Sequence, residues 1–307
     1  QRHVPNGDAI WVRRGEGHGE GVLGVVDARS LVQVPSGEIW LGSNDRGLAV
    51  LDTDLRLLKG IAPGQGGYRG GRAGAMAYRA QDDTVWVAGD AGVNVFAATG
   101  RRFLRSLPVG RGRMRVMRVG SDGTVWAGLE DGLYRWSGAG AFERVRINDG
   151  QPLTGDVNAL GIASDGRLWV GGEGGLFTRG AAEPTPRRVD LGVERQTVLG
   201  LLVDRQQRLW VDTEAGLLQL SGWQGDRPRF EFVSAKLGRA GATIGANLLE
   251  DRAGRIWTHR GVYDPTSGHY EEISAADGVD IGTGWFRAYT GLSDGRLLFG
   301  GSRGVLV

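Results

Sequence analysis

The chain has 307 residues, and glycine accounts for 55 of them, about 18% where roughly 7% is usual. An apolar content of 40% excludes an intrinsically disordered chain, and the absence of cysteine excludes disulfide scaffolds, thiolate zinc sites and cysteine nucleophiles. The 37 cationic and 35 anionic side chains leave a formal charge of +2, which does not fit a general nucleic-acid-binding protein, and no apolar run is long enough to span a membrane.

A repeat of 40–47 residues runs along the chain, and a tryptophan marks the same place in six copies. These residues are Trp40, Trp86, Trp126, Trp169, Trp210 and Trp257, and Leu298 takes the seventh place. In the fourth copy, an apolar stretch before Ser164 predicts a first strand, Asp165-Gly166 a tight turn, residues 168–170 a second strand and residues 176–177 the start of a third. A less regular fourth strand follows in most copies. Such a unit cannot bury both faces of its sheet alone, so we expect the copies to stack with the tryptophans in the core.

The seventh copy ends after a third strand, and an additional strand at residues 9–13 precedes the first copy. We therefore predict an all-β fold, a seven-bladed β-propeller with four-stranded blades, in which the N-terminal strand completes the last blade and closes the ring. The whole chain is then a single domain. In chain order, the predicted blades span about residues 28–60, 74–107, 114–147, 157–191, 198–233, 245–273, and 286–307 together with 8–14.

The repeat follows the pattern V-x-x-ϕ-x-x-D-x-G-x-ϕ-W-ϕ-G-T-x-x-G-ϕ, where ϕ is apolar, and residues 114–134 and 157–177 carry it best. This pattern resembles the two-component regulator propeller repeat, and the resemblance covers nearly the whole chain. Copies five and six depart from it at Gln206-Gln207 and Thr258-His259, which suggests that blades five and six face something different.

The resemblance implies a sensor fragment of a histidine kinase, a hybrid two-component protein or a diguanylate cyclase. We accordingly expect a ligand-sensing input domain in the bacterial periplasm, as part of an inner-membrane protein whose signalling domains are fused or partner chains. Any catalysis would belong to those output domains, and we expect no membrane insertion by this fragment.

Alignment of the copies places seven residues at the start of the innermost strands: Arg29, Ala75, Arg115, Asn158, Leu199, Ala246 and Arg287. Guanidinium groups bind carboxylates and sulfates through two parallel hydrogen bonds, so the three arginines and the asparagine predict a site for a polar or anionic ligand at the mouth of the central channel. In the alternative interpretation the arginines pair with carboxylates and seal the channel, the candidates being Asp27, Glu130 and Asp156.

Glycine-rich loops add three candidates on the same face: Tyr68 and Arg72 in GQGGYRGGRAG, and Trp285 in GTGWFR. An aromatic ring among glycines can stack on a sugar, which makes a glycan fragment a possible ligand. Alternatively, such a ring packs onto the next blade. The predicted ligand-binding residues are thus Arg29, Arg115, Asn158, Arg287, Tyr68, Arg72 and Trp285, with no catalytic residue.

We expect no metal and no cofactor. The nearest metal pattern, Glu16-Gly17-His18-Gly19-Glu20, lies in a glycine-rich segment that would hold an ion poorly, and His259 is expected to be a hydrogen-bonded spacer. Two other functions stay open: a protein-interaction or homodimerisation scaffold without a small ligand, and a propeller lyase of the streptogramin-degrading kind. The four histidines show no constellation for lyase chemistry.

Overall fold

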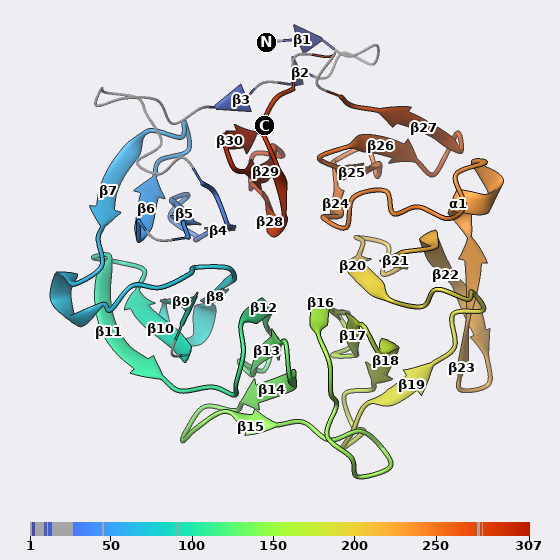
Figure 1. The fold of residues 1–307 in the computed structure, drawn as a ribbon, viewed down its shortest axis with the longest axis horizontal. Coiled ribbons are helices and arrows are strands. Elements are labelled where there is room, and N and C mark those ends of the chain that lie inside the picture. Colours follow the sequence, from blue (N-terminus) through green and yellow to red (C-terminus); the bar gives the residue numbers. More distant parts are fainter. Residues whose placement is uncertain are drawn as a thin grey trace. The chain divides into compact units, whose positions relative to one another are not determined.

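The computed structural model describes residues 2–3, 9–10, 12–13, 27–44, 46–90, 92–274, 277 and 279–307 (Figure 1). They belong to two compact units, one formed by residues 1–108, 259–262 and 271–307 and the other by residues 109–258 and 263–270. The metal pattern at residues 16–20 lies outside the described residues.

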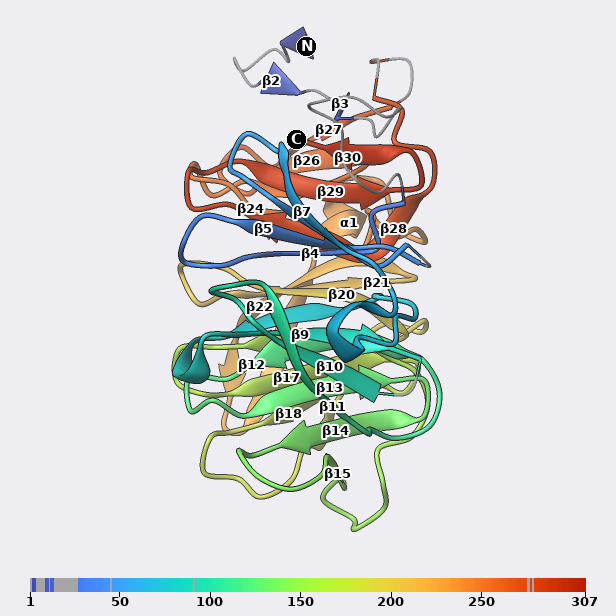
Figure 2. The ribbon, with the colours of Figure 1, turned by 90° about the vertical axis from the view of Figure 1, so that its left-hand side faces the viewer.

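Seven four-stranded antiparallel sheets form a seven-bladed β-propeller, which confirms the predicted fold class. Blade one contains β4 (Ser30–Gln33), β5 (Ile39–Gly42), β6 (Leu48–Leu51) and β7 (Leu57–Ile61). Blade two contains β8 (Met76–Arg79), β9 (Thr84–Gly89), β10 (Gly92–Ala97) and β11 (Arg102–Leu107). In Figure 2, β4 and β5 of blade one lie side by side, drawn in blue.

The second compact unit contains the next three blades. Blade three contains β12 (Met114–Val119), β13 (Val125–Leu129), β14 (Gly132–Trp136) and β15 (Glu143–Arg144). Blade four contains β16 (Val157–Ile162), β17 (Leu168–Gly172), β18 (Gly175–Arg179) and β19 (Arg187–Val189). Blade five contains β20 (Val198–Val203), β21 (Leu209–Thr213), β22 (Gly216–Gln224) and β23 (Arg227–Phe232).

Blade six contains β24 (Leu249–Glu250), β25 (Ile256–Thr258), β26 (Gly261–Asp264) and β27 (His269–Glu272). Blade seven contains β28 (Gly284–Gly291), β29 (Leu297–Gly301), β30 (Gly304–Leu306) and β3 (Val12–Arg13). Outside the blades, the described residues include a two-stranded sheet and short helices. The sheet consists of β1 (Arg2–His3) and β2 (Ala9–Ile10), and the helices are η1 (Gln65–Gly67), η2 (Ala80–Asp82) and α1 (Val233–Lys236).

The in-register tryptophans form the core, as predicted, and each of the six is at most 9% exposed. Trp40 of blade one packs with Val85 and Phe96 of blade two, and Trp169 of blade four packs with Val211 of blade five. Burying these rings between neighbouring sheets removes the largest apolar surfaces of the chain from water. The tryptophans are therefore structural and not ligand platforms.

The aspartates of the Asp-Gly turns are structural too. The carboxylate of Asp165 accepts a hydrogen bond from the backbone N–H of Arg167 at 2.9 Å, and Gly166 between them has φ +80°. Asp122 and Asp294 make the same contact with the residue two positions later. Each carboxylate thus fixes the turn between the first and second strands of its blade.

Of the described residues in the predicted N-terminal strand, residues 12–13 complete blade seven and residues 9–10 do not. Val12 pairs with Leu306 and Arg13 with Val305, so β3 occupies the outer edge of the last sheet. Residues 9–10 pair with β1 instead, in a separate two-stranded sheet. Closure of the last blade is therefore confirmed for residues 12–13.

Deletion of residues 1–13 is expected to lower the melting temperature by about 5 °C or more and to promote self-association, because β30 then has an unpaired edge. Deletion of residues 1–8 is the matched control, since it removes β1 and keeps β3. Thermal unfolding followed by circular dichroism, with size-exclusion chromatography, measures both effects. Identical melting of the two deletions and the parent would contradict the closure.

Candidate functional site

The aligned ligand-binding position is a β-bulge in the inner strands of blades three, four and five. In β12, Met114 pairs with Leu129 of β13 and Val116 pairs with the adjacent Gly128, so the residue between Met114 and Val116 is extra. The same shift in register occurs in β16 and β20. The extra residues are Arg115, Asn158 and Leu199. A bulged residue is freed from the strict alternation of a strand, so its side chain can be aimed differently from those of its neighbours. The repeat alignment located this position, but it gave no sign of the bulge.

Arg115 lies between two carboxylates. Its Nη2 is 2.8 Å from Asp156 Oδ2 and 3.1 Å from Glu130 Oε1, and Arg113 Nε also pairs with Glu130 at 2.9 Å. The backbone N–H of Arg113, together with the charges of both arginines, lowers the pKa of Glu130. The alternative interpretation, in which the arginine pairs with Asp156 or Glu130, is thus confirmed for Arg115.

Arg29 and Trp285 come together in the first unit. The Arg29 guanidinium carbon lies 3.4 Å from the centre of a Trp285 ring, and Arg29 Nε donates to Asp27 at 2.9 Å. Trp285 Nε1 donates to the other oxygen of the same carboxylate at 2.5 Å. Asp27 therefore holds both groups, and the arginine covers one face of the indole ring that the sequence suggested for stacking on a sugar.

Tyr68 does not belong to a surface site, so its assignment was wrong. The side chain is fully buried, and its ring packs against Phe96 and Phe103 with centroids 5.2 and 6.5 Å apart. Burial, with a smaller contribution from the charge of Asp90, raises the pKa of Tyr68 to about 12. Gly67 and Gly70 on either side have positive φ, a conformation that lets the chain turn the ring into the core.

The other candidates, Asn158, Arg72 and Arg287, already contact neighbouring protein groups. Asn158 is 9% exposed and donates to the carbonyl oxygen of Val198 at 3.1 Å. Arg72 Nε donates to the side chain of Asn44 at 2.8 Å. Arg287 is half-buried with φ +74°, and its guanidinium carbon is 6.0 Å from the Phe286 ring centroid. The structure therefore brings Arg29 and Trp285 into contact and leaves the remaining candidates in local contacts of their own.

Of the acidic residues that follow the second strands, Glu130 was predicted at this face as a partner of the arginines, whereas Asp90 and Glu173 were not. Asp90, Glu130 and Glu173 each accept a backbone N–H from the segment that leads into the inner strand of the same blade. Ser302 does the same with its hydroxyl group in blade seven. The recurrence of an acidic residue after the second strand in copies two, three and four was the available signal. These carboxylates hold the loops, and Glu130 also pairs with Arg113 and Arg115.

Asp212, a buried aspartate of the second unit, was missed as well. It is fully buried in β21 at the place that Gly128 and Gly171 occupy in blades three and four. Its carboxylate accepts hydrogen bonds from the Thr243 hydroxyl group and from the backbone N–H groups of Ile244 and Ala246, the latter at 3.1 and 2.8 Å. Burial raises the pKa of Asp212 and these hydrogen bonds oppose the rise. The aspartate in place of glycine was the signal in the sequence.

His259 is mostly buried in the first unit. A Cβ atom on Gly284 would lie 2.5 Å from its Cδ2, and its Nδ1 has no hydrogen-bond partner among the described residues. Burial and the charge of Arg260 lower its pKa from 6.5 to about 4. The histidine is therefore a neutral packing residue. It was expected to be a hydrogen-bonded spacer, but its Nδ1 forms no hydrogen bond to a described residue.

The lowered pKa of His259 predicts acid sensitivity. Because the folded-state pKa lies below the unfolded value, the stabilisation is present above pH 6.5 and is lost as the pH falls toward 4. We expect His259 to account for a loss of up to about 3 kcal/mol in unfolding free energy over that range. His259→Gln should lack this component, whereas His269→Gln, at an exposed position, should keep it. Urea denaturation at pH 4, 5, 6 and 7 measures the difference, and equal pH profiles for both variants would contradict the prediction.

Within the described part of the chain, no group of three histidine, cysteine, aspartate or glutamate side chains is placed to hold a metal ion. The described helices include none that is both long and apolar enough to cross a membrane.

No protein-family model matches the sequence, and no curated protein matches it. Among solved structures, the extracellular domain of BT3049 from B. thetaiotaomicron, described as a hybrid two-component system, superimposes with a TM-score of 0.76 at 16% identity, over 94% of this chain and 40% of that chain. The extracellular domain of BT4673 from the same organism, described as a one-component system, gives a TM-score of 0.68 at 17% identity, over 92% and 38% of the two chains. Streptogramin B lyase gives 0.70 at 10% identity, over 97% and 96%.

The chain thus spans about two fifths of the length of the two extracellular domains. At these identities the likeness establishes the propeller fold, which sensors and a lyase share. The first of these structures is described as part of a two-component system, the class of protein whose propeller repeat the sequence pattern resembles.

Proposed function

We propose that this chain is the extracytoplasmic input domain of a membrane-bound bacterial signalling protein and that it senses a polar ligand such as a glycan fragment. The likeness of 94% of the chain to the extracellular domain of BT3049 carries the proposal, and the repeat pattern supports it from the sequence. The bacterial periplasm is the proposed compartment. Fused or partner signalling domains of an inner-membrane protein would supply the output and any catalysis.

The charges at the inner-strand starts favour a hydroxyl-rich ligand over a strongly anionic one. Arg115 already contacts Glu130 and Asp156, and Arg29 already contacts Asp27, so an anion would have to compete with these carboxylates. A hydroxyl group can accept a hydrogen bond from a guanidinium and donate one to a carboxylate at the same time. The Arg113 side chain is 59% exposed, and it is thus more accessible than the side chains of Arg115, at 28%, and Arg29, at 21%.

The proposal predicts ligand-dependent stabilisation. Differential scanning fluorimetry of the purified chain with a panel of neutral and uronic-acid-containing oligosaccharides is expected to identify at least one that raises the melting temperature. Arg115→Ala and Arg287→Ala should each reduce that rise, whereas Arg102→Ala, on the exposed outer strand of blade two, should not. If no oligosaccharide stabilises the chain and sedimentation shows a concentration-dependent dimer, the scaffold function replaces this one.

A further inference from the structure

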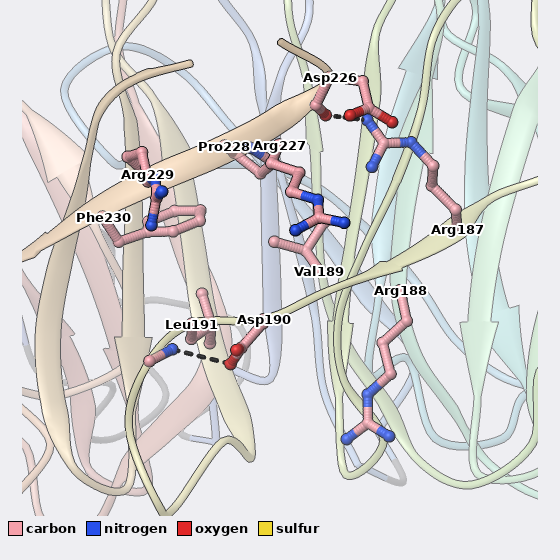
Figure 3. A pocket seen from close by; sticks show the side chains of 11 residues that line it. Arg187, Arg188, Val189, Asp190, Leu191, Asp226, Arg227, Pro228, Arg229 and Phe230 are labelled. Atoms are coloured by element: carbon pink, nitrogen blue, oxygen red, sulfur yellow. Dashed lines mark hydrogen bonds between the residues drawn. The ribbon is translucent and has the colours of Figure 1, made fainter. Parts of the chain in front are cut away.

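A cleft of about 440 Å³ lies between the outer strands of blades four and five. Strand β19 and the residues after it form one side, and the tip of the β22–β23 hairpin with the start of β23 forms the other (Figure 3). The volume falls within the range of small-molecule sites. Both blades belong to the same compact unit, and none of the predicted ligand-binding residues lines the cleft.

Arginine dominates the lining. Four arginines and two aspartates give the cleft a net charge of +2, equal to the formal charge of the whole 307-residue chain. The arginines are Arg187, Arg188, Arg227 and Arg229. Among the described residues none of the four forms an ion pair, whereas Arg208 and Arg255 in the same unit each pair with an aspartate at 2.6 Å. The positive charge of the cleft is therefore not neutralised from within.

Among the described residues, neither of the two aspartates forms an ion pair with these arginines. Asp190 accepts hydrogen bonds from the backbone N–H of Gly192 at 2.9 Å and from the side chain of Gln196 at 3.2 Å. Asp226 receives Arg187 through its backbone carbonyl oxygen, as Figure 3 shows, and a carbonyl does not cancel the charge of the guanidinium. An incoming anion would thus meet arginines that hold no carboxylate.

The strands that line the cleft are anchored in the hydrophobic core. Val189 and Leu191 belong to the core shared by blades four and five, and Phe230 packs against that core. Pro228 is buried, and because successive residues of a strand point to opposite faces, Arg227 and Arg229 both project from the exposed face of β23. Because these strands are packed, the backbone positions of the arginines are fixed before a ligand binds, and this lowers the entropic cost of binding.

We propose that this cleft binds a compact multivalent anion that carries two or more carboxylate, sulfate or phosphate groups. The guanidinium groups bind its oxygens by charge-assisted, two-point hydrogen bonds, while the half-buried Phe230 contacts the rest of the molecule. The site goes beyond the proposed sensing face, because it uses different residues on the outer strands. Either site can fail without the other.

Isothermal titration calorimetry of the purified chain with citrate and with tripolyphosphate tests the proposal, and acetate and inorganic phosphate serve as the less charged comparators. At least one of the two multivalent anions is expected to bind with one-to-one stoichiometry, at least about tenfold more tightly than its comparator. Citrate binding would indicate a carboxylate ligand and tripolyphosphate binding a phosphate ligand. The affinity should fall as salt rises from 50 to 200 mM, because the arginines are exposed enough to be screened.

The double variant Arg227→Gln/Arg229→Gln should weaken binding about tenfold or more, and the single variant Arg229→Gln should weaken it less. Arg102→Gln, an exposed arginine of the outer strand β11 in another blade, is the matched control and should bind like the parent. Equal melting temperatures for all variants show that they remain folded. Absence of binding by the parent, or an equal loss in the double variant and in Arg102→Gln, would overturn the proposal.

Discussion

Asp212→Ala is expected to lower the free energy of unfolding by about 3 kcal/mol or more. The substitution removes the acceptor of two buried backbone N–H groups, those of Ile244 and Ala246, and of the Thr243 hydroxyl group. These donors lie in the segment that starts blade six, and the carboxylate that binds them lies in blade five. Loss of Asp212 therefore weakens the junction of two blades as well as one side chain. Urea denaturation at pH 7 measures the change.

Asp54→Ala is the control for that experiment. The Asp54 side chain is 68% exposed, and its pair with Arg56 at 3.6 Å lies in solvent, where such pairs contribute less than about 1 kcal/mol. Similar unfolding free energies for Asp212→Ala and Asp54→Ala would show that the buried carboxylate does not hold the junction.

Gly200→Ala is expected to cost about 3 kcal/mol or more at the same junction. A Cβ atom on Gly200 would lie 1.8 Å from the carbonyl oxygen of Ala246 and 2.7 Å from its carbonyl carbon. Both atoms are backbone, so no side-chain rotation relieves the overlap, and β20 must move away from the start of blade six.

Gly222→Ala is the matched substitution in the same blade, because nothing lies within 4 Å of the added Cβ. It should leave the unfolding free energy within about 0.5 kcal/mol of the parent, as ordinary surface substitutions do. Chemical denaturation of the two variants measures the difference between their unfolding free energies. Equal stability would mean that the close approach of the two blades is not required.

Much of the fold could be predicted because the sequence pattern of one blade recurs in seven copies. The tryptophans gave the second strands, the Asp-Gly turns gave the strand connections, and the missing fourth strand of the last copy indicated where the N-terminal strand pairs. The exact length of that strand could not be predicted, because residues 9–13 read as one apolar stretch whereas residues 9–10 pair with β1.

The site was harder to predict, because side-chain direction there depends on bulges and on loop paths. Arg115 was placed correctly at the start of an inner strand, yet only the bulge determines that it reaches both Glu130 and Asp156. Tyr68 was assigned to the surface on the basis of its glycine neighbours, and the same glycines turn it into the core. The cleft between the outer strands of blades four and five depends on the β22–β23 hairpin reaching β19, which strand periodicity does not reveal.

The departures of copies five and six were expected to mark blades that face something different, and the structure gives them local roles. Gln207 takes the positive φ of +63° that glycine has in the Asp-Gly turns, and its side chain accepts the backbone N–H of Ser164 in blade four at 2.7 Å. His259 packs against Gly284 of blade seven. These replacements join neighbouring blades, so they are explained by packing within the propeller.

The native reading frame beyond Val307 is the most direct test of the sensory role. The account predicts that the frame continues into a membrane helix and a kinase or diguanylate-cyclase module. A stop codon at or just after Val307 would contradict the fused arrangement, because the propeller would then have no output domain in its own chain.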